Sequence, residues 1–307
     1  MSIILSDHKP ILIAGPTASG KSNLALEVAQ KTGGAIINAD ALQVYTGWNI
    51  LSARPNVKDL SQCPHYMYGY ITMQQPYSVG VWLREIKQQL QDCANRNERP
   101  IIVGGSGLYF SALTQGLADI PEVPAAVRKK ADEMALDQGR DVFAGLLKQQ
   151  DPDTYAKIDV QNPVRTQRAW EVLIATGSGL SKWQKNQQSP LIPEKDAHLI
   201  SLISDKDWLN ARITKRFDLM VSQGALDECR TALDSWWDET LPSCKAIGAK
   251  ELISHLKGEL SLTEAVEAAK LQSRRYAKRQ RTWFRSRMKS WHKLYLSDDN
   301  FDYSALF

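Results

Sequence analysis

Short apolar runs alternate with amphipathic segments along the first hundred residues of the chain. Three runs have the length of buried β-strands: 11–15, 35–39 and 100–103. Two segments between them are helical in character: 21–31 and 81–96. Strands that alternate with helices indicate a parallel sheet with helices on both faces. Such sheets bind ligands beyond the carboxyl ends of their strands.

The pattern changes after about residue 121, where the strand signals disappear. Helical spacing follows at 127–150 and 163–176, and then a polar run that is typical of a loop. Residues 198–204, HLISLIS, predict another strand, and the rest is predicted as helices: 207–224, 227–237, 250–257 and 263–289. We therefore expect an α/β fold whose parallel-sheet core, like that of P-loop nucleoside triphosphatases, carries a helical insertion domain. The expected ranges are 1–116 and 198–307 for the core and 117–197 for the insertion.

Composition restricts the class of protein further. The 307 residues are 43% hydrophobic, which is enough for one large core or two modest ones. The four cysteines form no C-x-x-C pair and the five histidines are scattered, so we expect neither disulfides nor a zinc site. No apolar run approaches the roughly 18 residues of a membrane helix, and the N-terminus does not resemble a secretion signal. We therefore expect a cytoplasmic protein without membrane contact.

The positive charge of the chain is concentrated in one segment. Residues 270–289, KLQSRRYAKRQRTWFRSRMK, contain nine Lys or Arg and no acid, whereas the other residues hold 29 basic and 34 acidic side chains. On a helix, several of these basic residues would share one face: Arg274, Lys278, Arg281, Arg285 and Lys289. Such a face is either a footprint for an anionic partner or a solvated surface.

A glycine-rich motif joins the first predicted strand to the first predicted helix. The sequence GPTASGKS has the spacing G-x-x-x-x-G-K-[ST] of a phosphate-binding loop. In such a loop, backbone N–H groups at the helix N-terminus point at phosphate oxygens, Lys21 adds a charge and the Ser22 hydroxyl reaches Mg²⁺. The candidate phosphate-binding residues are Gly15, Pro16, Thr17, Ala18, Ser19, Gly20, Lys21 and Ser22.

Asp40 and Thr17 are candidate catalytic residues near this loop. Asp40 follows the second predicted strand, which we place next to the first, so its carboxylate would face the bound phosphates. There it would either accept a proton from a nucleophile or serve only as a helix cap or metal ligand. Thr17 would either bind the oxygen between substrate and leaving group or only stabilise the turn. Transfer from ATP is less well supported, because the run before Asp40, the candidate acid for Mg²⁺, includes the polar Asn38.

Eight stretches of the chain together resemble the tRNA dimethylallyltransferases, which add an isopentenyl group to tRNA. In the family's order they are GPTASGKS (15–22), NADALQVY (38–45), SARP (52–55), PHY (64–66), YSVGVW (77–82), VGGSGLY (103–109), IGAKEL (247–252) and RRYAKRQRTWFR (274–285). The loop alone occurs in many families. Its combination with DALQVY and AKRQRTWFR is highly specific.

The resemblance implies a reaction and the residues that carry it. Members of the family transfer the five-carbon group of dimethylallyl diphosphate to N6 of the adenosine on the 3′ side of the anticodon, with Mg²⁺ as cofactor and diphosphate as leaving group. By position, Asp40 would be the general base and Thr17 would lie near the bridging oxygen. Ser22 would support the metal, and Arg212, in LNARITKRF, would stabilise the diphosphate. Metal and cations aimed at the leaving group would supply much of the acceleration.

The resemblance also implies contacts with the anticodon stem-loop of tRNA, whose adenosine must leave the base stack to react. The residues carried over as tRNA contacts are Asp40, Ala41, Leu42, Gln43, Ser106, Arg128, Arg165, Arg168, Lys250, Lys278, Arg279, Gln280 and Arg285. Three positions depart from the usual pattern: Ala41 stands where Ser is frequent, Ser106 where Thr is frequent and Ala249 where Tyr is frequent. The expected partners are tRNA and dimethylallyl diphosphate, bound by a monomer.

Two other functions fit parts of the pattern. A small-molecule P-loop kinase would share the loop but would phosphorylate an alcohol from ATP. An RNA-binding P-loop switch would share the loop and the basic segment without any chemistry. Among prenyltransferases, free adenosine phosphates are the alternative acceptors, but the insertion and the basic segment favour tRNA.

Overall fold

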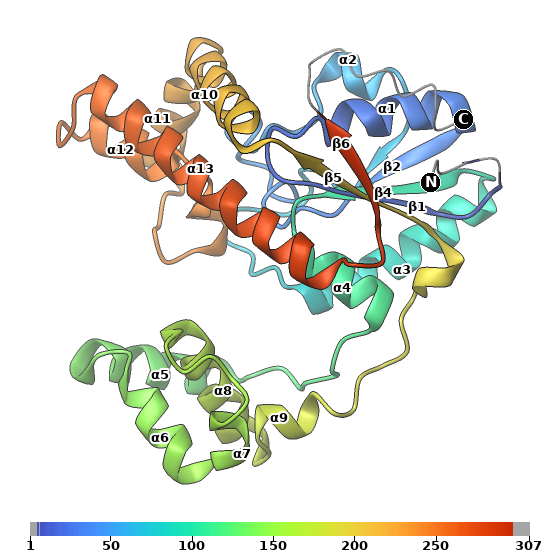
Figure 1. Ribbon diagram of the computed structural model, residues 1–307. Coiled ribbons are helices and arrows are strands. Elements are labelled where there is room, and N and C mark those ends of the chain that lie inside the picture. Colours follow the sequence, from blue (N-terminus) through green and yellow to red (C-terminus); the bar gives the residue numbers. More distant parts are fainter. Residues whose placement is uncertain (1–4, 6, 297–307) are drawn as a thin grey trace. The chain divides into compact units, whose positions relative to one another are not determined.

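A parallel β-sheet forms the centre of the larger part of the molecule (Figure 1). The computed structural model describes Leu5 and residues 7–296. Within these residues the sheet has six strands in the order β3-β2-β4-β1-β5-β6, and each neighbouring pair is parallel. The strands are β1 (Ile11–Ala14), β2 (Gly34–Asn38), β3 (His65–Tyr66), β4 (Arg99–Gly104), β5 (His198–Ser204) and β6 (His292–Leu296). The predicted α/β fold with a parallel sheet is confirmed.

Helices cover both faces of this sheet, as the alternating pattern predicted. On one face, Ile11 and Ile13 pack in a buried cluster with Leu24 of the first helix. On the other face, Leu12 and Ile37 pack with side chains from three helices. Successive residues of a strand point to opposite faces, so a strand covered on both sides is apolar throughout. The helices concerned are α1 (Lys21–Thr32) on the first face and α3 (Val79–Asn95), α4 (Gly107–Gln115) and α13 (Leu262–Arg287) on the second.

A further group of helices holds the segment that follows β2. Tyr45 and Trp48 are buried among side chains of this group, and Figure 1 shows its helices beside the sheet. The Glu228 carboxylate accepts hydrogen bonds from the backbone N–H groups of residues 49–51 at 2.5 to 3.0 Å. These bonds fix a stretch that belongs to no helix or strand. The group consists of α10 (Lys206–Ser222), α11 (Ala225–Ser235) and α12 (Ala249–Leu256), together with α13.

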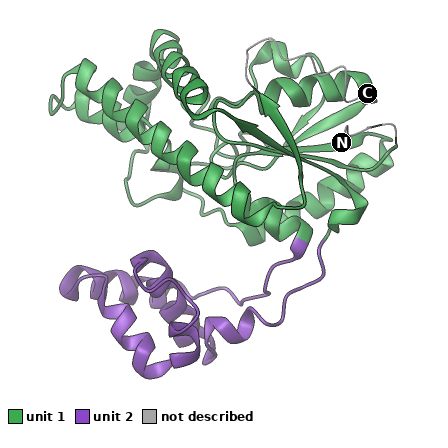
Figure 2. Cartoon of the chain, in the orientation of Figure 1, with its two compact units in different colours: residues 1–114, 191–307 green, residues 115–190 purple. Residues whose placement is uncertain are grey.

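Residues 115–190 form a compact unit of their own, and residues 1–114 and 191–307 form the other (Figure 2). The smaller unit has a separate core, in which the rings of Phe143 and Trp170 lie 5.4 Å apart. A core of its own is what defines a domain. Its helices are α5 (Ala125–Gln138), α6 (Val142–Gln150), α7 (Pro152–Tyr155), α8 (Pro163–Thr176) and α9 (Leu180–Trp183), the last within the polar run expected as a loop.

Three elements around the sheet escaped the apolar pattern: β3, β6 and α4. Strand β3 has only two residues, which is too short to show a period. The remaining elements are short: α2 (Val57–Leu60), η1 (Glu194–Asp196) and η2 (Pro242–Lys245). Among the described helices none is both long and apolar enough to cross a membrane.

One expectation about the sheet is wrong. Strand β4 lies between β1 and β2, so the strand before Asp40 is not next to the strand that feeds the glycine-rich loop. The order of strands in a sheet is set by packing between distant segments, and the chain order does not reveal it. The segment after β2 packs closely on the end of β4, where glycine is needed because a β-carbon on Gly104 would lie 2.0 Å from the Ala39 carbonyl oxygen.

Candidate active site

The glycine-rich loop connects β1 to α1 and ends at the N-terminus of that helix. Ala18 and Gly20 have positive φ angles of 62° and 92°, which turn the backbone sharply. In the described residues no side chain caps the N-terminus of α1, so its first N–H groups remain available to an anion. Lys21 folds back over the loop, where its Nζ donates to the Pro16 carbonyl at 3.4 Å. This is the geometry of a phosphate-binding loop.

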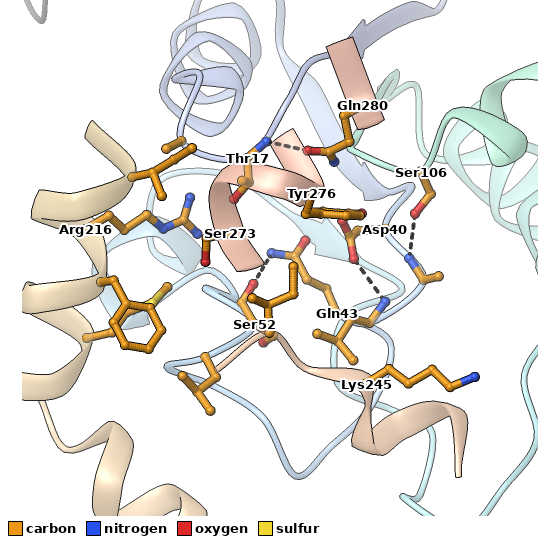
Figure 3. A pocket seen from close by; sticks show the side chains of 18 of the residues that line it. Thr17, Asp40, Gln43, Ser52, Ser106, Arg216, Lys245, Ser273, Tyr276 and Gln280 are labelled. Atoms are coloured by element: carbon orange, nitrogen blue, oxygen red, sulfur yellow. Dashed lines mark hydrogen bonds between the residues drawn. The ribbon is translucent and has the colours of Figure 1, made fainter. Parts of the chain in front are cut away.

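A cavity of about 350 Å³ opens beside this loop (Figure 3). Its polar lining residues include Thr17, Lys21, Asp40, Gln43, Ser52, Ser106 and Arg216. Its apolar lining residues include Leu42, Leu51, Ile213, Phe217, Met220 and Ile247. Helix α13 contributes Ser273, Tyr276, Arg279 and Gln280. The lining therefore combines groups that can bind a charged ligand with groups that can contact a hydrocarbon.

Asp40 is held at the edge of this cavity by backbone hydrogen bonds. The buried Asn38 side chain accepts from the Asp40 N–H at 2.8 Å and donates to the Asp40 and Met67 carbonyls at 3.0 Å. This explains a polar residue at the end of an apolar strand. Asp40 Oδ1 accepts from the Leu42 N–H at 2.9 Å, whereas Oδ2 has no donor among the described residues. A fixed carboxylate with one free oxygen is suited to accept a proton.

Four basic side chains line the cavity together with Asp40: Lys21, Arg216, Lys245 and Arg279. Burial affects the first two. Burial lowers the pKa of Lys21 to about 8, the nearby Arg216 lowers it further and Asp40 opposes the shift. Burial also lowers the pKa of Arg216, again opposed by Asp40. A bound anion would raise both pKa values again, because a nearby negative charge stabilises the protonated forms of Lys21 and Arg216. The electrostatics thus favour an anionic ligand.

The two arginines of LNARITKRF lie in different places. Arg212 donates from Nε to the Ala18 carbonyl at 2.9 Å, and its guanidinium lies 4.8 Å from the Trp208 ring. It therefore braces the backbone of the loop. Arg216, one helical turn later on α10, lines the cavity itself. Sequence reasoning missed Arg216, although the spacing of four residues places both side chains on one face of the helix.

Ser22, the expected metal-supporting residue, lines a second cavity of about 50 Å³ together with Gln43, Arg54 and Tyr68. Within the described residues there is no cluster of three or more His, Cys, Asp or Glu side chains that would hold a metal alone. Ser22 is not among the residues that line the larger cavity with Asp40. Its hydroxyl, like the Asp40 carboxylate, is an oxygen of the kind that suits Mg²⁺. Mg²⁺ usually takes most of its ligands from water and substrate phosphate, so a sparse set of protein donors fits it.

The expected tRNA contacts lie in several places within the larger unit. The Ser106 hydroxyl accepts from the Ala41 N–H at 3.0 Å, and Gln43 donates to the carbonyls of residues 52 and 53 at 2.9 Å. On α13, Arg279 and Gln280 line the cavity, and Lys278 and Arg285 are exposed. Lys250 is exposed and pairs with Glu239 at 2.6 Å.

Three further expected contacts belong to the smaller unit. Arg128 and Arg165 are exposed, and Arg168 is half-buried and lies 3.6 Å from Glu171. Arg165 and Arg168 share one face of α8. The position where tyrosine is frequent, Ala249, is fully buried in the core of the larger unit and does not line the cavity.

The parallel sheet and the glycine-rich loop between β1 and α1 define the chain as a P-loop protein. A family model described as IPP transferase matches residues 43–287. The chain is 54% identical to the tRNA dimethylallyltransferase of Cereibacter sphaeroides, over 95% of this chain and 90% of that protein. It is also 54% identical to the enzyme of the same name from Dinoroseobacter shibae, over 94% of this chain and 95% of the relative. The chain therefore belongs to the tRNA dimethylallyltransferase family of prenyltransferases.

Solved structures agree with this assignment. The tRNA isopentenylpyrophosphate transferase of Bacillus halodurans is 30% identical, with a TM-score of 0.69 over 97% of this chain and 93% of that one. A eukaryotic dimethylallyltransferase acting on tRNA is 27% identical, with a TM-score of 0.80 over 94% of this chain and 74% of that one. The family resemblance stated from the motifs is confirmed.

Proposed function

We propose that this protein transfers the dimethylallyl group of dimethylallyl diphosphate to N6 of the adenosine on the 3′ side of the anticodon of tRNA. The N6–C1 bond forms, the C1–O bond to diphosphate breaks and the amine proton goes to Asp40. The observation that supports this reaction best is that the Asp40 carboxylate, the phosphate loop and an apolar wall line the same cavity of about 350 Å³.

The charged end of the cavity would hold the diphosphate. Backbone N–H groups of the loop, Lys21 and Arg216 would bind its oxygens, and Thr17 would lie near the bridging oxygen. Mg²⁺, held by Ser22 and by the diphosphate itself, would help to stabilise the charge that develops on the leaving group. Arg212 would act through the loop backbone that it braces.

The apolar wall would hold the hydrocarbon. Ile213, Phe217 and Met220 project from α10 toward the cavity, and Leu42 lies on the segment that carries Asp40. A five-carbon group placed against these side chains would direct its reactive carbon toward the Asp40 carboxylate. The adenine would enter from the side of α13, where Tyr276 offers an aromatic face beside Asp40 (Figure 3).

The acceptor would be the anticodon stem-loop, attracted by basic residues outside the cavity. These are Lys250, Lys278, Arg279 and Arg285 in the larger unit and Arg128, Arg165 and Arg168 in the smaller one. Phosphate contacts of this kind make binding strongly dependent on salt. Because tRNA is the acceptor, we place the reaction in the cytoplasm, with the protein acting as a monomer.

Labelled donor tests the proposal directly. Purified protein is incubated with Mg²⁺, radiolabelled dimethylallyl diphosphate and either unmodified tRNA or AMP. We expect label in the tRNA and none in AMP. Label in AMP alone would identify a different acceptor. A parallel incubation contains ATP and an alcohol. Transfer of phosphate to the alcohol there, with no prenyl transfer in the first assay, would instead identify a kinase.

A further inference from the structure

Gln280 connects the phosphate loop to the glycine turn that follows β4. Its side-chain oxygen accepts a hydrogen bond from the Thr17 N–H at 2.8 Å (Figure 3). Its side-chain nitrogen donates to the Gly105 carbonyl at 3.0 Å. The residue is 5% exposed, so both ends of the amide form hydrogen bonds in a buried environment. One residue of α13 thus ties together two turns at the edge of the sheet.

The absence of a side chain at Gly105 makes this arrangement possible. A β-carbon there would lie 2.3 Å from Gln280 Nε2 and 3.4 Å from Asp40 Oδ2. Gly105 is not among the residues with positive φ, so its backbone conformation alone does not require glycine. The space that the missing side chain leaves is filled by the Gln280 amide. Glycine is therefore needed here for the approach of Gln280.

We propose that Gln280 is a positioning residue that holds the phosphate loop in its binding shape, which is a different role from the tRNA contact inferred from the motif. The inference rests on the proposed function, because the loop must bind the diphosphate. Other contacts hold the neighbouring residues of the loop, since Lys21 donates to the Pro16 carbonyl and Arg212 to the Ala18 carbonyl. Gln280 is the partner of the Thr17 N–H, and an N–H left without its partner in a partly buried site costs free energy. With the Thr17 N–H fixed, the Thr17 side chain keeps its place beside the leaving group.

The same contact links donor binding to the helix that faces the acceptor. Lys278 and Arg279 directly precede Gln280 on α13, and they are exposed and available to tRNA phosphates. A shift of α13 would therefore move the loop partner as well.

Gln280→Met tests the role, since it keeps the volume of the side chain and removes both hydrogen bonds. Binding of inorganic diphosphate with Mg²⁺, without tRNA, is measured by calorimetry. We expect it to weaken about tenfold, as two lost hydrogen bonds imply. Affinity for tRNA without diphosphate should change by no more than about twofold. In prenyl transfer, kcat should fall while KM for tRNA is kept.

Gln272→Met is the matched control, because it alters the same residue type two turns earlier on α13. It should leave diphosphate affinity unchanged. If Gln280→Met does not fold, Gln280→Ala is measured instead. Normal diphosphate affinity combined with weaker tRNA binding would overturn the proposal and make Gln280 a tRNA contact. Unchanged affinities with a lower melting temperature would reduce it to a structural residue.

A double-mutant cycle tests the geometry independently. Gly105→Ala should strongly weaken diphosphate binding in the wild-type background but add little to Gln280→Ala, because the clash partner is then gone. Additive effects would contradict the fit between the two residues. Failure of the proposed function would give a different result. Diphosphate would bind more weakly to Gln280→Met than to the wild-type protein, but the wild-type protein would transfer no prenyl group to tRNA.

Discussion

At the edge of the cavity, Asp40 combines a fixed backbone with a free carboxylate oxygen. The Asn38 side chain and the Leu42 N–H hold it, and Oδ2 accepts no hydrogen bond in the described residues. Lys21 and Arg216 supply positive charge around it. In the proposed reaction, Lys21 and Arg216 bind the leaving group and Asp40 accepts the proton, and three predictions follow from these roles.

Asp40→Asn should abolish prenyl transfer while donor and tRNA still bind. The amide oxygen can replace Oδ1 as acceptor for the Leu42 N–H, so the local fold is kept, but an amide cannot take the proton. We expect a loss in kcat of about two to four orders of magnitude. Single-turnover assays check the rate, and calorimetry checks donor binding. Normal turnover would show that another group is the base.

Donor affinity should fall as the pH rises above about 8. Burial favours the neutral amine of Lys21, whose pKa is lowered to about 8, so free protein loses this charge there rather than near 10.5. A bound diphosphate would stabilise the charged form, so binding above pH 8 takes up a proton. The protein is titrated with dimethylallyl diphosphate at pH 7.5, 8.5 and 9.5, each in two buffers. These titrations measure the affinity and the proton uptake on binding. In Lys21→Arg, which stays charged, the pH effect should disappear.

Arg216→Gln should weaken donor binding more than Arg212→Gln. Arg216 lines the cavity, whereas Arg212 contacts the loop through the Ala18 carbonyl. Loss of a charged hydrogen-bond donor facing diphosphate costs about 1.5–3 kcal/mol, or roughly ten- to a hundredfold in affinity. Lys215→Gln, an exposed neighbour on the same helix, is the control. The reverse order would support the assignment of Arg212 made from the motif.

Among the elements, α13 contributes to the core, to the cavity and to the positively charged surface. A capping box formed by Ser261 and Glu264 starts the helix, which runs for 26 residues. Its buried face, with Ala277 and Phe284, packs into the protein core, and Tyr276 and Gln280 reach the cavity. Its outward residues carry the charge. One helix therefore contributes to the core, the donor site and the expected tRNA surface.

Removing two exposed charges from α13 should weaken tRNA binding without affecting the donor. Lys278 and Arg285 are exposed, and each would neutralise one phosphate. The double variant Lys278→Gln with Arg285→Gln should lower the slope of log affinity against log salt by about 1.5 to 2. Filter binding at several salt concentrations measures it. Lys87→Gln, exposed on α3, is the control, and an unchanged slope would reject this helix as the footprint.

In the molecule as a whole, the cavity is assembled from segments that are far apart in the chain. The loop at residues 15–22 meets α10 and α13, and the Thr17–Gln280 bond spans 263 residues. Glu228 of α11 anchors residues 49–51, next to the cavity residue Ser52. All residues that line the cavity thus belong to the larger unit. The smaller unit has a core of its own and carries three of the expected tRNA contacts.

The sequence alone determined most of the regular elements, the phosphate loop and the family. These depend on residues close together in the chain: apolar runs for β1, β2 and β4, helical spacing for α1 and α8, and motifs of a few residues. Only the tertiary structure decided that β4 separates β1 from β2, that Arg216 rather than Arg212 lines the cavity, and that Gln280 holds the loop. Strand order and side-chain contacts arise when distant segments pack together, and no local pattern records which segments will meet.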